Sequence, residues 1–372
     1  MPAPRWLFYA LGGGLGHFQR SFSLARAAVR RGVECVIVAN SDWLHQQAPA
    51  NRQQLAMLTP RTAGTGKQLH ASCELRLLPP QLTPAESGRA MNALLSQPWD
   101  AVIVDTFPRG LGGELAPWLP TGDALKVWTH RDISPEYLDV YEIRTHWAPH
   151  YDLILSPGEH GELAGLAVTT AAWLVLDPAE LASPATARAG WGCDGERRLV
   201  LVVAAGRGEE PRQFAEVAKQ LARAMPELEV RLASLASLAS LADASESSSW
   251  PLLGRLSAVD LIFGGGGYNT THEAAALQIP HLGVAFPRQY DRQERRLRQL
   301  GCSVIAPALW ESLWRGNAEA VRRIVTEIRQ QLAASSAREL RLDASRDPAR
   351  YLNGQPNGVH AAVEAILAAE RR

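Results

Sequence analysis

The chain has 372 residues, of which 46% are hydrophobic and 20% charged, a composition typical of a globular protein long enough for two domains. Its 38 Lys and Arg residues equal its 38 Asp and Glu residues, so it lacks the basic excess of nucleic-acid-binding proteins and we expect no nucleic-acid partner. No stretch approaches the roughly 20 apolar residues of a membrane-spanning helix, and the N-terminus lacks the apolar region of a signal peptide. The four cysteines match no metal-site spacing. We therefore expect a cytoplasmic protein with reduced thiols, whose membrane contact is at most peripheral.

The first half of the chain predicts a parallel α/β domain. The apolar run at 5–11 is bounded by glycine and predicts a buried strand, and residues 18–29 carry apolar side chains at helical spacing before Gly32. A strand at 33–39 follows, so strand, glycine loop, helix and strand form a βαβ unit. Further strands are predicted at 101–105, 125–129, 152–156 and 172–176, with a less regular stretch at 59–90.

The second half predicts another α/β series after a linker at 177–198, which is rich in proline, glycine and small residues. Its elements are strands at 198–205, 228–233, 259–263, 281–286 and 303–306 and a helix near 212–224. The Ala-Ser-Leu repeat at 233–249 predicts a surface loop or a short helix with no function. We therefore predict two Rossmann-like domains, 1–180 and 181–355, followed by a helix within 356–372 that can pack on either of them.

Two glycine clusters each lie between a predicted strand and a predicted helix. The first, GGGLG at 12–16, is followed by His17, and the second, GGGG at 264–267, is followed by YNTTHE. Glycine permits a tight turn with open backbone N–H groups, and a helix N-terminus adds donors and a positive dipole end, so such a loop can hold a diphosphate. Neither cluster continues with Lys-Ser/Thr, which excludes a Walker-type loop, and His17 stands where a dinucleotide-binding motif has its last glycine.

The residues around both clusters resemble a known family. GGGLGHFQRSFSLARAAVRRG is similar to the first loop and helix of GT-B nucleotide-sugar glycosyltransferases, such as the lipid I N-acetylglucosaminyltransferase and the UDP-glycosyltransferases. DLIFGGGGYNTTHEAAALQIPHLGVAF resembles their donor-binding signature, and GGYNTTHE with VDTFPRG looks closest to bacterial predicted glycosyltransferases. The resemblance implies the α/β GT-B fold, in which two Rossmann-like domains with parallel sheets face each other across a cleft, the first for the acceptor and the second for the nucleotide-sugar donor.

The resemblance also implies a set of donor-binding residues. They are Gly265, Gly266, Gly267, Asn269, Thr270, Glu273 and Arg207, with Gln289, Asp291 and Gln293 in the loop after residues 281–286. The glycine loop would hold the diphosphate, with the helix dipole in place of a metal, and Glu273 would accept hydrogen bonds from the ribose. Asn269 and Thr270 would reach phosphate oxygens or cap the helix. Arg207 would contact base or phosphate, or lie in a surface turn. The loop at 287–294 departs from the Asp-Gln or Gln-Gln pair of many relatives, so the donor sugar is not predicted.

His17 is the predicted catalytic base. At a helix N-terminus the dipole lowers its pKa and favours the neutral imidazole, which can take a proton from an acceptor hydroxyl. The resemblance implies that Asp105, at the end of the strand at 101–105, orients this histidine. A structural role is also open for each residue, as a helix cap for His17 and as a strand-end turn for Asp105. The acceptor-binding candidates are Gly14, Gly16, His130, Arg131 and Asp132.

The resemblance implies a metal-independent, inverting glycosyltransferase that moves a sugar from a nucleotide diphosphate sugar, with UDP as the expected nucleotide, to an acceptor hydroxyl. No metal or other cofactor is expected, because His272-Glu273 begins like a zinc-binding H-E-x-x-H but position 276 is alanine. The spacing G-x-G-H-x-x-R-x-x-x-L-A also resembles UDP-sugar hydrolases of the nonulosonic acid pathway, in which His17 would activate water. The same residues are compatible with a non-catalytic nucleotide-sugar-binding protein and, more remotely, with a nucleotide-sugar epimerase. The sequence distinguishes neither UDP from dTDP or GDP donors nor one oligomeric state from another.

Overall fold

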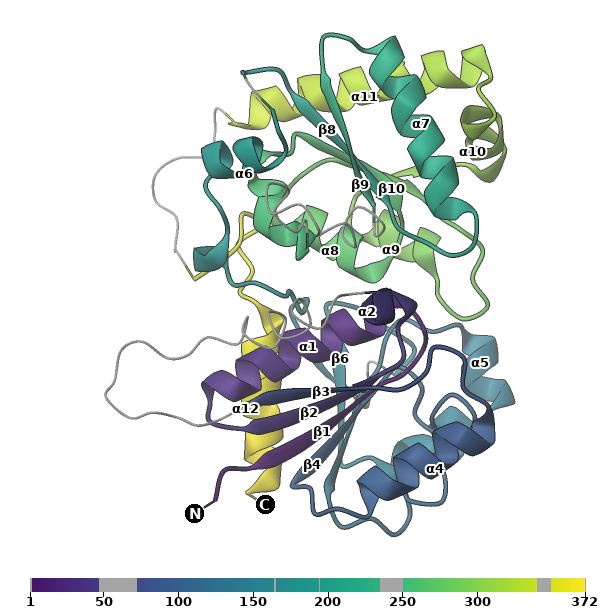
Figure 1. Ribbon diagram of the computed structural model, residues 1–372, viewed down its shortest axis with the longest axis vertical. Helices are drawn as coiled ribbons and strands as arrows, with labels where there is room; N and C mark the ends of the chain where they lie inside the picture. Colours follow the sequence, from purple (N-terminus) through teal and green to yellow (C-terminus); the bar gives the residue numbers. More distant parts are fainter. Residues whose placement is uncertain are drawn as a thin grey trace. The chain divides into compact units, whose positions relative to one another are not determined.

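The structure, a computed structural model, describes residues 2–46, 72–163, 165–193, 195–234, 250–339 and 349–371. The chain divides into two compact units, Met1–Val175 with Asn357–Arg372, and Leu176–Pro356. Each unit contains one parallel sheet with helices packed on it (Figure 1). The prediction of two parallel α/β units is therefore confirmed. The sequence left open on which unit the last helix packs, and the structure places this helix in the first unit.

The sheet of the first unit has seven parallel strands in the order β3-β2-β1-β4-β5-β6-β7. The strands are β1 (Arg5–Ala10), β2 (Glu34–Ala39), β3 (Cys73–Leu77), β4 (Ala101–Asp105), β5 (Leu125–Thr129), β6 (Leu153–Pro157) and β7 (Val168–Thr170). The central strands β1 and β4 are continuous buried runs, as expected for a parallel sheet covered on both faces.

Helices α1 (Leu15–Arg30) and α12 (Gly358–Glu370) pack against each other on this sheet, and α12 also contacts β5, β6 and β7 (Figure 1). The shorter helices of the unit are α2 (Asp42–Gln46), α4 (Pro84–Leu95), α5 (Pro135–Val140), the π-helical turn η1 (Ile143–Trp147) and the 3₁₀ turn η2 (Ala148–His150). Helix α4 starts at a capping box, because Thr83 and Glu86 exchange side-chain and backbone hydrogen bonds and Pro84 stands at the first helical position.

Two predictions for this unit were wrong. The apolar run at 172–176 is not a strand, although Trp173, Leu174 and Val175 are buried. The side chain of Asn357 accepts a hydrogen bond from the Leu174 N–H and donates one to the Leu174 carbonyl, so this backbone is satisfied at the start of α12 and not in the sheet. The stretch at 59–90, predicted as less regular, includes β3 and the start of α4 among its described residues.

The sheet of the second unit has five parallel strands in the order β12-β11-β10-β8-β9. They are β8 (Leu199–Ala204), β9 (Glu229–Ser234), β10 (Leu261–Gly265), β11 (His281–Val284) and β12 (Ser303–Ile305). Its remaining turns and short helices are η3 (Pro178–Glu180), α6 (Pro184–Gly190) and η4 (Leu252–Ala258). The predicted linker at 177–198 thus contains a helix. Residues 235–249, most of the Ala-Ser-Leu repeat, lie outside the described part of the chain.

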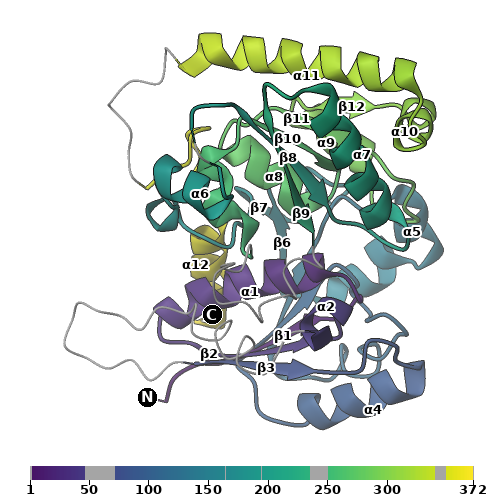
Figure 2. The ribbon, with the colours of Figure 1, turned by 45° about the horizontal axis from the view of Figure 1, so that its top comes forward.

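Helices cover both faces of this second sheet. Helices α7 (Glu210–Ala224), α10 (Pro307–Trp314) and α11 (Ala318–Glu339) pack together, and Figure 2 shows them on one side. Leu282 and Val284 of β11 join Phe214 of α7 and Trp310 of α10 in one apolar core. The intervening Gly283 faces α9 (Gln293–Gln299), since a Cβ atom there would come within 2.3 Å of a Leu297 methyl. Helices α8 (Tyr268–Ala276) and α9 therefore lie on the opposite face.

Candidate functional site

Each sheet reverses its strand order at one place. In the first sheet β1 and β4 are neighbours, with β2 and β3 on one side and β5, β6 and β7 on the other. In the second sheet β8 and β10 are neighbours in the same way. Open parallel sheets bind ligands beyond the carboxyl ends of the strands at such a point. The predicted residues His17, Asp105, Arg207 and the glycines of the second cluster lie at or just beyond these four strand ends.

In the first unit, the glycine loop and the histidine fit around each other. Gly12 has a φ of +154°, and a Cβ atom there would lie 2.4 Å from Cδ2 of the His17 ring. Any larger residue would therefore collide with the imidazole, so glycine is required at this position. Gly14 is the N-cap of α1 and makes no side-chain cap, and Gly16 is the second residue of the helix. His17 does not cap α1, because its ring Nδ1 lies 2.6 Å from Oδ2 of Asp105.

Three side chains share the buried carboxylate of Asp105. Besides His17, the guanidinium of Arg20 donates from Nε to Oδ1 at 2.9 Å and from Nη2 to Oδ2 at 2.7 Å. The hydroxyl of Thr106 donates to Oδ2 at 2.9 Å. Asp105 and Arg20 are each 1% exposed and His17 is 8% exposed, so these contacts are shielded from bulk water.

The pKa values of this cluster follow from its charges. Burial raises the pKa of Asp105, but the charge of Arg20 and the hydrogen bond from His17 lower it more, and the net pKa is well below the usual range. Burial lowers the pKa of His17, Asp105 opposes this change, and Arg20 and Arg131 add to it, with a net lowering. Asp105 is thus an ionised acceptor, which requires that Nδ1 of a neutral His17 carries the proton and that Nε2 carries the lone pair.

The chain after β4 is bent sharply beside this histidine. Thr106 has a φ of +69°, a conformation that is unfavourable for a β-branched residue. It is held there because its N–H donates to the Thr129 carbonyl and its own carbonyl accepts from the Trp128 indole. The turn places Phe107 against the His17 ring, with centroids 5.5 Å apart. Strained backbone of this kind gathers at functional sites.

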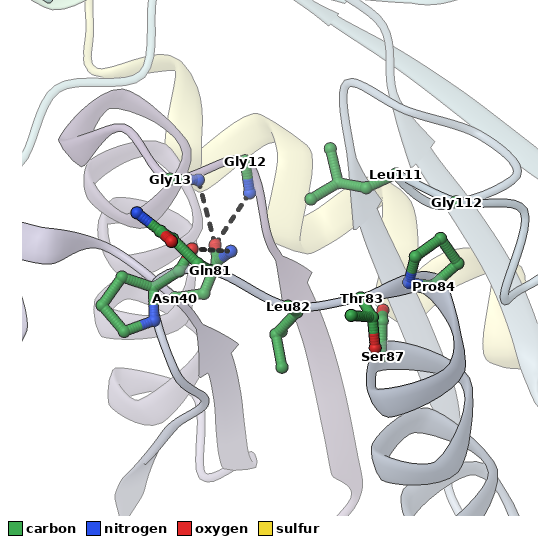
Figure 3. Close-up of a pocket in the computed structure, with 11 residues that line it drawn as sticks. Gly12, Gly13, Asn40, Gln81, Leu82, Thr83, Pro84, Ser87, Leu111 and Gly112 are labelled. Carbon is green, nitrogen blue, oxygen red and sulfur yellow. Dashed lines mark hydrogen bonds between the residues drawn. The ribbon is translucent and has the colours of Figure 1, made fainter.

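A pocket of about 340 Å³ has Gly12 and Gly13 of the glycine loop in its wall. The carboxamide oxygen of Asn40, just after β2, accepts hydrogen bonds of 3.0 Å from the N–H groups of Gly12 and Gly13 (Figure 3). The remaining wall consists of uncharged residues, which are Pro80, Gln81, Leu82, Thr83, Pro84, Ser87, Leu111 and Gly112. The loop that frames His17 is therefore also one wall of a small uncharged pocket.

A buried carboxylate behind this pocket fixes its far wall. Glu114 accepts hydrogen bonds of 2.6 Å from the hydroxyls of Tyr9 and Ser87 and one of 2.8 Å from the N–H of Gly112. Burial raises the pKa of Glu114, but these hydrogen bonds lower it by more, so the net pKa is below its usual value. The charge of Glu114 is thus satisfied internally.

The remaining acceptor-binding candidates differ in placement. His130 is fully buried, and its ring centroid lies 4.9 Å from that of Trp128. Its Nε2 packs so close to Gly161 that a Cβ atom on this glycine would lie 2.5 Å from it. Asp132 is also buried, and its backbone N–H donates to Glu159. Arg131 is partly exposed and is close enough to His17 to lower its pKa. Arg131 is therefore within electrostatic reach of the histidine.

In the second unit, the glycine loop leads directly into α8. Gly267 is the N-cap of the helix, makes no side-chain cap, and would leave open space around an added Cβ atom. The first helical bond is donated by Thr271 to the Gly267 carbonyl, so the N–H groups of Tyr268, Asn269 and Thr270 point out of the helix end. Neither Asn269 nor Thr270 is therefore the capping residue.

Gly266 was predicted to hold the diphosphate, but its N–H group is already bonded within the sheet. The Gly266 N–H donates to the Val284 carbonyl in the sheet, so it is not available to a phosphate oxygen. A Cβ atom on Gly266 would lie 2.8 Å from a Leu297 methyl, which explains the need for glycine there. The Gly266 carbonyl accepts a hydrogen bond of 2.8 Å from the buried Arg296. Gly265 ends β10 and pairs with Val284.

The loops beyond β8 and β11 are tied to each other. Arg207 is exposed, and its N–H donates to Glu210 at 2.9 Å. The carboxylate of Glu210 receives two hydrogen bonds from Arg288, at 2.7 and 2.5 Å. Such a two-pronged pair fixes geometry as well as charge, so the loop that carries Arg207 is anchored to the segment that precedes Gln289.

The three donor-sugar candidates in the 287–294 loop are not equivalent. Gln293 is buried, and its carboxamide accepts from the Phe286 N–H and donates to Asp291. Asp291 also accepts a hydrogen bond of 2.6 Å from Arg296. Gln289 is exposed. Gln293 and Asp291 thus hold the loop together, and the side chain of Gln289 is the accessible one. Glu273 is 2% exposed on α8.

Sequence reasoning missed Arg20, Asn40, Glu114 and Arg296. Arg20 stood inside the quoted G-x-G-H-x-x-R spacing, one turn after His17, which was the available signal. Within the described ranges, no group of three or more His, Cys, Asp or Glu side chains could hold a metal ion. No helix in the same ranges is long and apolar enough to cross a membrane.

No family model matches the sequence, and no curated protein is significantly similar to it. Solved structures do match it over nearly their full length. MurG of Acinetobacter baumannii is 14% identical with a TM-score of 0.52, and the match covers 99% of this chain and 100% of that chain. UGT89C1 of Arabidopsis thaliana, complexed with UDP, is 15% identical with a TM-score of 0.51, covering 98% and 100%. Spinosyn rhamnosyltransferase SpnG, complexed with thymidine diphosphate, is 18% identical with a TM-score of 0.50, covering 90% and 100%. The chain therefore has the predicted GT-B fold.

Proposed function

We propose that this chain, whose fold is GT-B, is a glycosyltransferase that moves a sugar from a nucleotide diphosphate sugar to an acceptor hydroxyl. Solved structures with the same fold include a rhamnosyltransferase complexed with thymidine diphosphate and a protein complexed with UDP. Because a fold alone does not establish an activity, the proposal rests on the two strand-order reversals and the residues that lie there.

The observation that carries the proposal is the buried contact of 2.6 Å between His17 and Asp105. We assign His17 as the general base and Asp105 as the residue that orients it. Nε2 takes the proton of the acceptor hydroxyl while the acceptor oxygen bonds to the anomeric carbon and the bond from that carbon to the diphosphate breaks. General base catalysis of this kind contributes about 10²–10⁴-fold to a rate. The single displacement inverts the configuration at the anomeric carbon.

The N-terminus of α8 is the proposed site of the leaving diphosphate. The N–H groups of Tyr268, Asn269 and Thr270 point out of the helix, and no acidic residue stands in its first turn. Backbone donors and the positive end of the helix stabilise the charge that develops on the leaving group. These groups would replace a metal ion, so the proposed reaction needs no metal or other cofactor. Gly265 and Gly267 flank this site, and Gly266 supports it through packing.

The remaining donor contacts are assigned by position. Glu273 is proposed to bind the ribose, Arg207 the base or the phosphates, and Gln289 the sugar. Gln289 is preferred for the sugar because Asp291 and Gln293 already hydrogen-bond within the loop. The donor is proposed to be UDP-linked, with a dTDP-linked sugar as the comparison to be tested.

The acceptor is proposed to occupy the pocket beside the first glycine loop. Gly12 is shared between this pocket and the His17 ring, and Arg131 approaches the same histidine. Gly14 and Gly16 are proposed to line the acceptor site at the start of α1, where a Cβ atom on Gly14 would meet open space. An uncharged wall with leucine and hydroxyl groups suits a neutral acceptor with apolar and hydroxylated parts.

The experiment that tests this proposal measures nucleoside diphosphate release from UDP-, dTDP- and GDP-sugars, with and without a cell extract as the source of acceptor. A transferase releases the diphosphate only when the extract is added, and EDTA leaves the rate unchanged. Release without the extract would identify a hydrolase. Binding of nucleotide sugar with no release in either condition would identify a non-catalytic binding protein.

A further inference from the structure

Arg20 has a contact pattern that the proposed reaction does not by itself explain. It is 1% exposed, and two of its nitrogens engage both oxygens of Asp105 at 2.9 and 2.7 Å. Its Nη2 also donates to the Thr106 hydroxyl at 3.2 Å and lies 3.5 Å from Nδ1 of His17. A buried guanidinium on the carboxylate that orients a catalytic histidine affects both the position and the charge of that carboxylate.

We infer that Arg20 is a positioning residue of this site: it locks the Asp105 carboxylate in one orientation and shares its charge, so that His17 is oriented as a base but kept weakly basic. The inference rests on the proposed role of His17 for its meaning in catalysis. The geometry on which it stands does not depend on which substrate binds.

The orientation follows from the hydrogen bonds. Oδ1 of Asp105 accepts from Arg20, and Oδ2 accepts from Arg20, Thr106 and His17. A carboxylate held by a planar two-pronged donor cannot rotate without breaking two charge-assisted bonds. Oδ2 therefore stays in line with Nδ1, and the His17 ring keeps the proton on Nδ1 and the lone pair on Nε2.

The charge balance determines how basic this lone pair is. The charged and polar groups that face His17 are Asp105 at the end of β4, Arg20 on α1 and Arg131 after β5, with the Phe107 ring stacked on it. Because Arg20 already neutralises Asp105, a protonated His17 would add a second positive charge to a buried cluster that Arg131 also approaches. A carboxylate without such a partner would stabilise the imidazolium more strongly. Burial lowers the pKa of His17 most, and Arg20 and Arg131 add to this lowering, so the neutral imidazole is favoured.

The test is an NMR titration of His17 in the full chain, with its imidazole signals assigned by comparison with His17→Gln. We expect the wild-type His17 pKa below its ordinary value and the Nδ1–H tautomer at neutral pH. Arg20→Gln removes the shared charge, and we expect the His17 pKa to rise by about one unit, a tenfold gain in proton affinity. Arg20→Lys keeps the charge without the two-pronged geometry, so the pKa should stay near the wild-type value while turnover falls.

The matched control is Arg26→Gln, which also removes a buried guanidinium from α1, one that donates to the Val175 carbonyl. We expect no change of the His17 pKa in this variant. An unchanged or lowered His17 pKa in a folded Arg20→Gln protein would overturn the inference, as would an equal rise in Arg26→Gln. If Arg20→Gln does not fold, the wild-type titration decides, because a His17 pKa above 7 would show a carboxylate whose charge is not shared. The pKa readouts need no turnover, so failure of the proposed function would not alter them.

Discussion

The two glycine loops of this chain look alike in sequence, but the structure gives them different tasks. Each loop follows one of the two strands between which the strand order of its sheet reverses, and each precedes a helix. In the first loop, Gly12 and Gly13 have positive φ angles, and Gly12 leaves room for the ring of His17. In the second loop, none of residues 264–267 has a positive φ, and Gly266 leaves room for Leu297. The first loop makes space for an imidazole, and the second lets a helix start close to the sheet with its N–H groups open.

The comparison shows that a glycine cluster between strand and helix does not by itself indicate a phosphate site. The residues directly after the glycines decide how the loop is used. His17 turns back to a carboxylate at the end of the neighbouring strand, 88 residues later. Residues 268–270 present only backbone donors at the start of α8. This difference agrees with the proposal of proton transfer at the first loop and diphosphate binding at the second.

The largest effect is expected from Asp105→Asn, which breaks the first half of the comparison. An amide cannot hold the charge of Arg20 or fix the tautomer of His17, so we expect turnover to fall by about 10²–10⁴-fold. Leaving Arg20 buried without its anion should lower the free energy of unfolding by about 3–5 kcal/mol. Turnover and urea denaturation measure the two effects. Asp260→Asn, at a backbone-binding aspartate of the second unit, is the control and should keep turnover of the folded protein near wild type.

The next effect separates two glycines of the first unit. Gly12→Ala places a methyl group 2.4 Å from the His17 ring at a positive φ, so the ring must move. We expect a loss of turnover of about 10–100-fold and a destabilisation of about 1–3 kcal/mol. Gly165→Ala, at an exposed position of the same unit that also meets nothing within 4 Å, is the control and should change turnover less than threefold. Equal losses in both variants would contradict the fit between Gly12 and His17.

The second loop allows the same kind of comparison. Gly266→Ala would push against Leu297 and Gln293, and we expect it to destabilise the protein by about 1–3 kcal/mol. Gly267→Ala has open space and should cost less than about 1 kcal/mol, but it narrows the helix end where the diphosphate is proposed to bind. We expect it to raise the donor Kd by about tenfold. Calorimetric titration with UDP and thermal unfolding of both variants separate packing from binding.

The smallest effect concerns a histidine that lies beside the second glycine loop. Burial lowers the pKa of His281 from its ordinary 6.5 to about 4, partly offset by the backbone of Gly264. The unfolded chain therefore binds this proton more readily, and folding stability is lost as the pH falls from about 6.5 to 4. At 1.36 kcal/mol per unit the loss amounts to at most about 3 kcal/mol. Denaturation curves of wild type and His281→Leu at pH 7.5 and 4.5 measure it, and equal acid sensitivity of both would contradict the assignment.

The strands were predictable from the sequence itself, whereas the pairing of His17 with Asp105 was implied by the resemblance and agrees with the strand topology. Apolar runs bounded by glycine indicate buried parallel strands, and the carboxyl ends of such strands share one edge, where His17 and Asp105 meet. Arg20 was not predictable in the same way, because arginines on a helix usually face solvent and its partner stands 85 residues away. His130 is packed against Trp128 and Gly161. The fold brings these residues together, so the sequence does not show that His130 is buried.

Backbone register was the other limit. The Gly266 N–H donates to the Val284 carbonyl of β11. The run of glycines does not indicate this hydrogen bond. The run at 172–176 has the composition of a strand, but Asn357, 183 residues beyond Leu174, satisfies its backbone. Hydrogen bonds between such distant residues carry no local signal, so periodicity alone assigned the wrong element type.

The most direct test of this division between the two loops compares wild type with His17→Gln in two assays. One assay measures the Kd for the nucleoside diphosphate that the release experiment identifies, and the other measures sugar transfer in a single turnover. His360→Gln, at an exposed position of α12, is the matched control. We predict that His17→Gln binds the diphosphate within about twofold of wild type and transfers sugar at least about 100-fold more slowly. Transfer at the wild-type rate, or loss of diphosphate binding together with transfer, would contradict the account.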